Sequence, residues 1–240
     1  YTVSGSDMSK SSMTDKLQSQ GAKIYIGQKK ENIVDGLDMV VYTAAIHPDN
    51  EELMTAKEKN ILTINRAAFL GQIMREYKNS IAVSGTHGKT TTTNMIKHVL
   101  SHKYDIGYLV GDGQGFMSKN AKYFVFEACE HRDHFLSYHP NVIICTNIDY
   151  DHVEYFKNKK QYVESFMSFF NNSKDELILN QNISYYKKCQ TYGTFKANVY
   201  ASNIKYKLDG TYFNLTINKT KYKNLYLPFF GKHQLEDALA

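Results

Sequence analysis

The run from Ser84 to Thr93, which reads Ser-Gly-Thr-His-Gly-Lys-Thr-Thr-Thr-Thr, contains the residue types that bind phosphate. Two glycines allow backbone N–H groups to approach phosphate oxygens, and the N-terminus of a following helix adds partial positive charge. Lys89 supplies a fixed cation, and the hydroxyl of Thr90 can ligate Mg²⁺. The run follows the apolar stretch Ile81–Val83 and precedes apolar residues at helical spacing. We therefore predict a strand, a phosphate-binding loop and a helix.

The match to the general nucleotide-binding motif is incomplete. That motif has a glycine five residues before its Gly-Lys pair, and Val83 occupies this position here. The alternative interpretation is a glycine turn beside a threonine-rich helix start, with no ligand. We favour the phosphate loop because Gly-Lys-Thr falls where a predicted strand becomes a predicted helix.

Two further polar clusters follow apolar strands. Glu127 and Glu130 come directly after Tyr123–Phe126, and a run from Thr146 to His152 comes after Val142–Cys145. Ligands of open α/β sheets bind beyond the carboxyl ends of the strands, so we expect the loop, the carboxylates and the histidine to converge. A phosphate loop, a carboxylate and an imidazole around one pocket indicate a site for Mg²⁺ and ATP.

Each of these residues also has a simpler interpretation. Glu127 could be a solvent-exposed carboxylate at a strand end, and His152 could begin a helix with Asp151 as its N-cap. We assign no chemistry to several other residues. Three histidines are expected at the surface or in packing, two cysteines in the core as small residues, and an aromatic stripe in the core: His131, His134, His139, Cys129, Cys145, Tyr162, Phe166, Phe169 and Phe170.

The elements that must position these residues alternate between strand and helix. In the first 79 residues we predict strands at Lys23–Ile26, Met39–Tyr42 and Ile61–Ile64, and helices at 9–20, 49–59 and 66–77. Such alternation is typical of a parallel, doubly wound α/β sheet.

A second unit is predicted to begin at Ile81. Its strands Ile81–Val83, Tyr123–Phe126 and Val142–Cys145 are nearly all apolar, as expected for strands buried on both faces, and 159–171 is predicted to be helical. Beyond residue 198 apolar and polar residues alternate, and Asp209-Gly210 is a turn signal before Tyr212–Ile217, which predicts a small β hairpin. The best domain boundary is Glu76–Ser80, giving domains 1–79 and 80–240.

Composition sets further limits. The 240 residues carry a net charge of +5, almost wholly from lysines scattered among Asn, Tyr and Glu, which predicts a solvated surface and no nucleic-acid partner. Three widely spaced cysteines suggest neither a disulfide framework nor a zinc site and fit a reducing compartment. We see no signal peptide and no apolar run of about 20 residues, so we predict a cytoplasmic protein without membrane insertion.

Taken together, the motifs resemble those of the Mur ligases of peptidoglycan synthesis over essentially the whole chain. Gly85–Thr92 is similar to the ATP loop of the family, in which the shorter glycine spacing is normal. Glu127–Leu136 resembles the version seen in many Gram-positive members, and Thr146–His152 resembles the second family signature. Val3–Asp7 and Tyr42–Ile46 resemble elements of the first domain.

The resemblance implies a Rossmann-like UDP-sugar domain at 1–79, without its first strand and phosphate turn, and a P-loop-type, parallel-sheet ATP-binding domain at 80–240. Because both ends fall inside predicted elements, we expect a fragment of a three-domain bacterial ligase that lacks its C-terminal domain. We expect this stretch alone to bind nucleotide weakly and to ligate nothing.

Within the family, the resemblance implies ATP-dependent ligation of L-alanine to the lactyl carboxylate of UDP-N-acetylmuramate through an acyl phosphate. It implies catalytic roles for Lys89, Glu127 and His152, and Mg²⁺ ligation by Thr90, Glu127 and His152. The implied ATP-binding residues are Gly85, Thr86, His87, Gly88, Lys89, Thr90, Thr91, His233, Gln234 and Asp237. The implied UDP-sugar contacts are Ser6, Asp7, Thr43 and Arg66.

One departure concerns the adenine contact. Gln234 and Asp237 stand where the family usually has two asparagines, and an ionised Asp cannot donate a hydrogen bond to a ring nitrogen as Asn can. Two alternative functions stay open. One is the recycling ligase that joins a murein tripeptide to the same sugar, and the other is a non-catalytic nucleotide-binding module.

Overall fold

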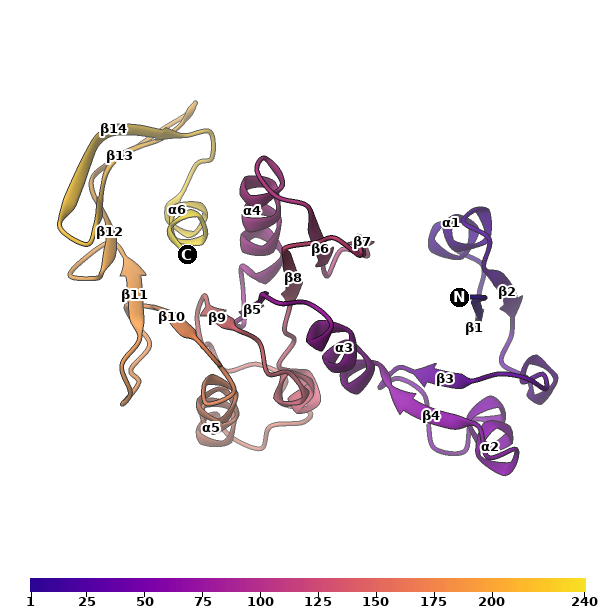
Figure 1. Cartoon of the computed structure of the whole chain (residues 1–240). Helices are drawn as coiled ribbons and strands as arrows, with labels where there is room; N and C mark the ends of the chain where they lie inside the picture. Colours follow the sequence, from indigo (N-terminus) through magenta and orange to yellow (C-terminus); the bar gives the residue numbers. More distant parts are fainter. The chain divides into compact units, whose positions relative to one another are not determined.

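The computed structural model describes residues 1–240, which divide into two compact units, Tyr1–Phe69 and Leu70–Ala240 (Figure 1). The division falls inside helix α3 (Arg66–Arg75), where Leu70 and Met74 on the C-terminal half are buried. The boundary predicted at Glu76–Ser80 follows the end of this helix, and the domain limits 1–79 and 80–240 stay a prediction.

The first unit contains short strands and helices in alternation. They are β1 (Ser4–Asp7), α1 (Ser12–Ser19), β2 (Lys23–Ile26), the 3₁₀ helix η1 (Lys30–Asn32), β3 (Met39–Tyr42), α2 (Glu51–Glu58), β4 (Leu62–Asn65) and the start of α3. Two predicted strands match β2 and β3, and the third is one residue later than predicted. The expectation of a single sheet is wrong here: β1 pairs only with β2 and β3 only with β4, both in parallel.

Polar contacts join these two strand pairs. The Glu52 carboxylate on α2 accepts hydrogen bonds from the Ser6 hydroxyl of β1 and from the Asn32 side chain, each at 2.6 Å. Leu53 and Ala56, on the same helix, are buried. Helix α2 therefore fixes the carboxyl end of β1 beside the β3–β4 pair.

The second unit is built on one ten-stranded sheet. Its elements are β5 (Ser80–Ser84), α4 (Lys89–Ser101), β6 (Ile106–Leu109), β7 (Gly115–Phe116), β8 (Tyr123–Glu127), the 3₁₀ helix η2 (His131–Ser137), β9 (Val142–Cys145), α5 (Lys159–Phe170), β10 (Glu176–Asn180), β11 (Gln190–Gly193), β12 (Val199–Lys207), β13 (Gly210–Ile217), β14 (Thr220–Leu227) and α6 (Lys232–Leu239). The strand order is β14-β13-β12-β11-β10-β9-β5-β8-β6-β7, and the seven strands from β12 to β6 run parallel. The predicted α/β class with a parallel sheet is confirmed.

Strand β5 lies at the centre, between β9 and β8. Its residue Ser84 is in register with Cys145, and Val83 is in register with Glu127. Ala82 and Val83 are fully buried, as are Phe126 and Cys145, which explains why these strands are apolar on both faces. The polar segments that follow β5, β8 and β9 therefore leave the sheet at the same edge.

The predicted hairpin is the beginning of a three-stranded antiparallel meander, β12-β13-β14, at the end of the sheet (Figure 1). The turn residues are Leu208 and Asp209, one position earlier than predicted, because Gly210 already pairs with Lys207. Strand β14 was not predicted, since its sequence is dominated by lysine, tyrosine and asparagine and most of its residues are exposed.

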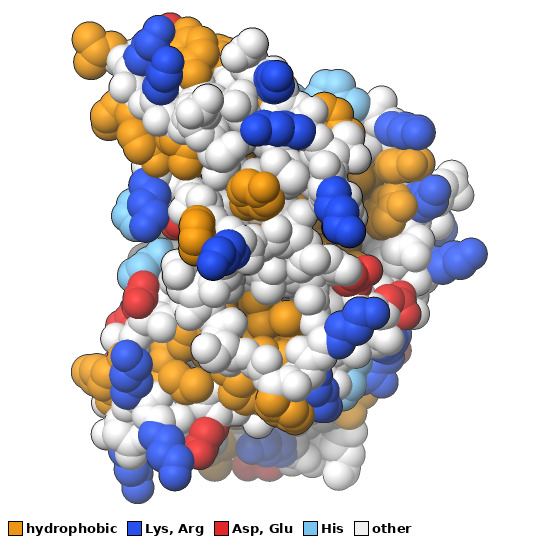
Figure 2. Space-filling model, turned by 90° about the vertical axis from the view of Figure 1, so that its left-hand side faces the viewer, with side chains coloured by type: hydrophobic (Ala, Val, Ile, Leu, Met, Phe, Trp, Pro, Cys, Tyr) orange, Lys and Arg blue, Asp and Glu red, His pale blue; other side chains and the backbone are white.

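The aromatic stripe of α5 is buried as predicted, with Tyr162, Phe166 and Phe169 at 0% exposure. Cys145 is also in the core, whereas Cys129 is only half-buried. On the face drawn in Figure 2, lysines and arginines are dispersed between white and orange side chains and form no continuous patch. None of the helices combines the length and apolar character that crossing a membrane requires.

Candidate active site

The loop between β5 and α4 has the shape of a phosphate cradle. Gly85 and Gly88 both have positive φ, 131° and 82°, which favours glycine. A Cβ atom at Gly85 would lie 2.0 Å from Thr146 Oγ1, and one at Gly88 would lie 2.3 Å from Asp237 Oδ1. The two glycines are therefore required both by the backbone conformation and by the close approach of side chains from neighbouring segments.

Residues after β9 hold this loop in place. The Thr86 N–H donates to the Asn147 carbonyl at 3.1 Å, and the His87 N–H donates to Asn147 Oδ1 at 2.9 Å. The Thr86 hydroxyl donates to the Asp149 carbonyl at 2.8 Å and accepts from the Asp149 N–H at 2.9 Å. The signature segment Thr146–His152 thus acts first as a rigid support for the loop.

Lys89 is the first residue of α4, and its ammonium group folds back over the loop. It donates to the carbonyls of Gly85 and Thr86, the latter at 3.1 Å, and to both carboxylate oxygens of Glu130, at 3.0 and 3.3 Å. Glu130 is 1% exposed and the Lys89 side chain 16% exposed. A buried charge needs such a partner, so Lys89 and Glu130 form a mutually dependent ion pair.

His152 joins the same cluster. Its Nε2 lies 3.5 Å from Glu130 Oε1, and its Nδ1 lies 3.3 Å from Glu154 Oε1. The residue has φ of 53°, in the left-handed region, and it is not helical. The alternative of a helix beginning at His152 is therefore wrong. Asp151 still accepts the His152 N–H at 2.7 Å, but in a turn instead of a helix cap.

The other predicted metal ligands lie at the same strand ends but do not share these contacts. Glu127, half-buried at the end of β8, accepts the Gly111 N–H at 2.6 Å. Thr90 is exposed in the first turn of α4, and Thr91 beside it is half-buried. The structure thus brings Lys89 and His152 together through Glu130, one of the two carboxylates that were predicted to converge here, although no specific role was predicted for it.

Tyr162 belongs to both the core and the site. It is 0% exposed, yet its hydroxyl is 2.8 Å from Thr86 Oγ1 and 3.4 Å from Glu130 Oε1. Burial raises its pKa well above the usual value for tyrosine, so the hydroxyl remains neutral and can donate. The prediction that Tyr162 is a core residue is confirmed. Its hydroxyl also contacts the loop and Glu130 and helps to position both.

A cleft of about 690 Å³ opens beside the loop. It is lined by residues of the loop, the segment after β9, the β10–β11 region and the start of α6, including His87, Gly88, Asn147, Asn180, His233 and Asp237. Gln234, also on α6, is half-buried. A cleft of this size suits a small organic ligand next to the phosphate cradle.

Asp237 carries the main electrostatic feature of that cleft. Burial raises the pKa of its carboxyl group to about 6, an effect opposed by the nearby Thr92 hydroxyl and by the charge of His233. The midpoint of its titration is therefore about pH 6, and its ability to donate a hydrogen bond is lost as the pH rises above that value.

The predicted sugar-nucleotide contacts all lie in or next to the first unit. Ser6 and Asp7 end β1, where Asp7 Oδ1 accepts the Ser9 N–H at 3.0 Å. Thr43 follows β3, and Arg66 begins α3; both are exposed. Ser6, Asp7 and Thr43 therefore lie at the carboxyl ends of β1 and β3, and Arg66 follows the carboxyl end of β4.

Comparison with known proteins agrees with this architecture. A model of the Mur ligase middle domain matches residues 83–240, and one described as Mur ligase family, catalytic domain, matches residues 1–78. The chain belongs to the Mur ligase family.

Individual relatives refine this placement. The UDP-N-acetylmuramate–L-alanine ligases of Clostridium beijerinckii and Clostridium perfringens are 42% and 40% identical to it; each alignment covers 100% of this chain and 56% of the relative. The chain thus spans a little over half the length of the curated relatives it matches.

Solved structures match equally well in fold. The crystal structure of UDP-N-acetylmuramate-alanine ligase MurC from Thermotoga maritima superposes with a TM-score of 0.84 at 27% identity, over 99% of this chain and 57% of that protein. The UDP-N-acetylmuramate:L-alanyl-γ-D-glutamyl-meso-diaminopimelate ligase from Neisseria meningitides reaches the same TM-score at 20% identity, over 99% of this chain and 83% of that protein. At 20% identity, the similarity to the Neisseria protein shows a shared fold only.

Proposed function

We propose that the chain is the sugar-nucleotide and ATP-binding part of a UDP-N-acetylmuramate–L-alanine ligase. The observation that carries the proposal is the glycine loop with Lys89, held at the sheet edge beside Glu130 and His152. The 42% identity to a ligase of that name supports the choice of substrates. Such a ligase would work in the bacterial cytoplasm, and Ser6, Asp7, Thr43 and Arg66 would contact the UDP-sugar.

The described residues fit ATP as a substrate. The loop leaves no room for a Cβ at Gly85 or Gly88, and the N-terminus of α4 directs its free N–H groups toward the same place. The cleft beside Gly88 has the volume for a base, with His233, Gln234 and Asp237 of α6 at or near its wall. Lys89 would contact the β- and γ-phosphates after exchanging its present partners.

The residues also fit Mg²⁺. Thr90 and Glu127 supply a hydroxyl and a carboxylate, which are the oxygen donors that Mg²⁺ prefers, and His152 adds an imidazole at the same edge. When bound, the ion would neutralise phosphate charge. The protein's own contribution is to hold these donors at the ends of adjacent strands.

The proposed reaction has two steps. A lactyl carboxylate oxygen attacks the γ-phosphorus of ATP, giving an acyl phosphate and ADP; the alanine amine then attacks the acyl carbon, inorganic phosphate leaves, and an amide remains. A free carboxylate is a poor acylating agent, and phosphorylation supplies the leaving group. Lys89 would stabilise the charge that develops on the transferred phosphoryl group.

The test uses the full-length protein with ATP, Mg²⁺ and UDP-N-acetylmuramate, and either L-alanine or the murein tripeptide as acceptor. We expect ADP release and a UDP-muramoyl-alanine product, identified by mass spectrometry, with L-alanine only. Lys89→Ala should lower the rate by at least ~10³-fold, on the scale of removing a cation from phosphoryl transfer. Lys160→Ala, at a side chain that is 84% exposed, is the matched control.

The alternatives give different results. Turnover with the tripeptide but not with L-alanine would assign the protein to murein recycling. Nucleotide binding without turnover on either acceptor would make it a non-catalytic nucleotide-binding protein. Near-normal turnover of Lys89→Ala would contradict the assignment of the loop.

A further inference from the structure

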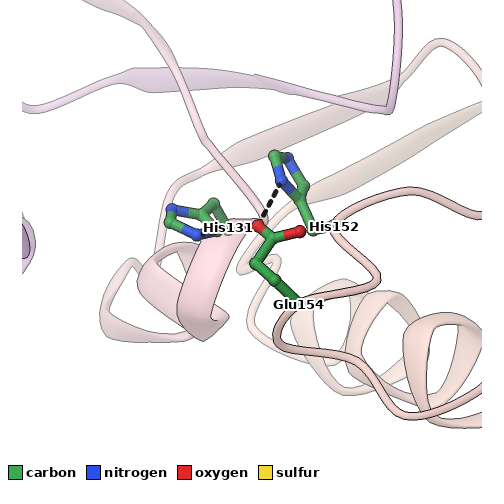
Figure 3. Close-up of side chains that lie close together, drawn as sticks. All are labelled: His131, His152 and Glu154. Carbon is green, nitrogen blue, oxygen red and sulfur yellow. Dashed lines mark hydrogen bonds and ion pairs between the residues drawn. The ribbon is translucent and has the colours of Figure 1, made fainter.

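Three side chains beside the nucleotide cradle, one of them His152, form a compact cluster of metal-binding groups (Figure 3). His131 begins η2, and His152 and Glu154 lie on the segment after β9. Their ligand atoms all lie within 4.8 Å of one another. Glu154 Oε1 is 3.4 Å from His131 Nε2 and 3.3 Å from His152 Nδ1. The carboxylate therefore lies against both imidazoles.

The two separations from Glu154 match those of ligands around one ion. Two ligand atoms bound at 2.0–2.1 Å with a tetrahedral angle lie about 3.3–3.4 Å apart. The centroids of two imidazoles on one ion, each about 3.2 Å from it, lie about 4.5–5.2 Å apart for angles between octahedral and tetrahedral. The rings of His131 and His152 have centroids 4.7 Å apart.

The surroundings also suit a metal site. A metal-bound histidine usually donates its second ring N–H to a carboxylate, which fixes the ring and strengthens the ligand. Here Glu130 Oε1 lies 3.5 Å from His152 Nε2, on the nitrogen that does not face Glu154. Glu154 is 62% exposed and the two histidines about 30% exposed, so an ion could reach the site from solvent.

We propose that His131, His152 and Glu154 bind one divalent transition-metal ion such as Zn²⁺ or Co²⁺. Two imidazoles and one carboxylate leave a position open for water and favour these ions over Mg²⁺, which prefers oxygen ligands. Because His152 belongs to both sites, such an ion and the Mg²⁺ of the nucleotide site compete for one imidazole. A transition-metal ion bound at this site would then inhibit the enzyme by occupying the imidazole that Mg²⁺ needs.

The experiment measures metal binding by the full-length protein, freed of metal with a chelator, without nucleotide. Co²⁺ is titrated and its visible d–d absorption is followed; Zn²⁺ is then added as a competitor. We expect one tight site, and a loss of affinity of at least ~100-fold in His131→Gln and in Glu154→Gln, since even outer-shell partners of a metal cost 10–100-fold. The Glu154→Gln variant should fold normally because this side chain is largely exposed, so a loss of metal affinity in it cannot be attributed to misfolding.

The matched control is His98→Gln, which removes one member of another close histidine pair, His98 and His102 on α4, with ring centroids 4.6 Å apart. The proposal fails if wild type binds no Co²⁺ or Zn²⁺, or if His98→Gln weakens binding while His131→Gln does not. It is supported if saturating Mg²⁺ and ATP weaken Co²⁺ binding in wild type by more than the chelation of Co²⁺ by the same concentration of free ATP accounts for. Ligase activity with Mg²⁺ is measured in a separate assay. Absence of Co²⁺ binding would therefore contradict the metal site without contradicting the proposed function, and absence of ligase activity would contradict the proposed function without contradicting the metal site.

Discussion

The ion pair between Lys89 and Glu130 gives a quantitative prediction about stability as well as chemistry. Replacing Lys89 by Met keeps the length of the side chain but leaves the Glu130 carboxylate at 1% exposure without its cation. Replacing Glu130 by Gln keeps an oxygen that can accept from Lys89 and Tyr162 but removes the negative charge. The two changes are therefore expected to have unequal costs.

The magnitudes follow from burial and distance. At 3.0 Å the gross attraction is about 5–6 kcal/mol with an effective dielectric constant of about 20. Much of that is offset by desolvation of the two charges, so the informative number is the cost of removing one partner. For Lys89→Met we expect about 3–5 kcal/mol, because a buried charge is left unpaired. For Glu130→Gln we expect about 1–2 kcal/mol, because Lys89 still donates to the amide oxygen and to two carbonyls.

The assay is urea unfolding of the two single variants, the double variant and the wild type. Far-UV circular dichroism is the suitable probe, since the chain contains no tryptophan. In the double variant neither charge remains, and it should cost about 2 kcal/mol less than the sum of the single variants. Lys160→Ala, at an exposed position, should change the free energy of unfolding by less than about 0.5 kcal/mol.

Two results would refute this reasoning. One is a Lys89→Met variant whose free energy of unfolding falls by less than about 1 kcal/mol, because a buried carboxylate without a cation should destabilise the fold by more than that. The other is strict additivity in the double variant, which would mean that the two side chains do not interact in solution.

Three further outcomes are expected. Asp237→Asn should be more stable than wild type at pH 8 but not at pH 4, as measured by urea unfolding. The pKa of the Asp237 carboxyl in the folded protein, about 6, is above its ordinary value of 3.8. The wild-type protein therefore loses stability as the pH rises through 6, and the Asn variant does not. Tyr162→Phe should lower the free energy of unfolding by about 1–2 kcal/mol through the lost bonds to Thr86 and Glu130. Glu127→Gln should raise the Mg²⁺ concentration needed for half-maximal nucleotide binding, in a calorimetric titration in which an unchanged curve would remove it from the metal site.

The edge of the sheet at which the candidate site lies could largely be predicted from the sequence, because the strands that end there have local apolar patterns. The apolar runs before Ser84, Glu127 and Thr146 predict buried parallel strands, and buried parallel strands end at a common edge. Besides β14, the strands β6, β7, β10 and β11 were missed. Ile106–Leu109 is short and includes a glycine, and Gln190–Gly193 has one large apolar side chain, so neither has a strong pattern. In Glu176–Asn180, however, the run Leu-Ile-Leu was a usable signal.

The partners within the site could not be predicted in the same way. Glu127 is the last residue of β8, and Glu130 comes three residues later. Which of them faces Lys89 depends on the backbone after β8, where Arg132 and Asp133 have positive φ and turn the chain sharply. The predicted surface role of His131 likewise missed its contact with Glu154, because the two residues come from segments separated by β9.

The contacts of Lys89 also bear on how a nucleotide would enter the loop. An ammonium group has three N–H donors, and the Gly85 carbonyl, the Thr86 carbonyl and the Glu130 carboxylate occupy all three. A phosphate therefore cannot simply add to this lysine but must replace a partner that is already well placed. The carbonyls belong to the loop that surrounds the phosphate, whereas Glu130 is a competing anion. Under the proposed function, nucleotide binding would therefore be an exchange of one anion for another at Lys89, while the Tyr162 hydroxyl keeps its contact with Glu130.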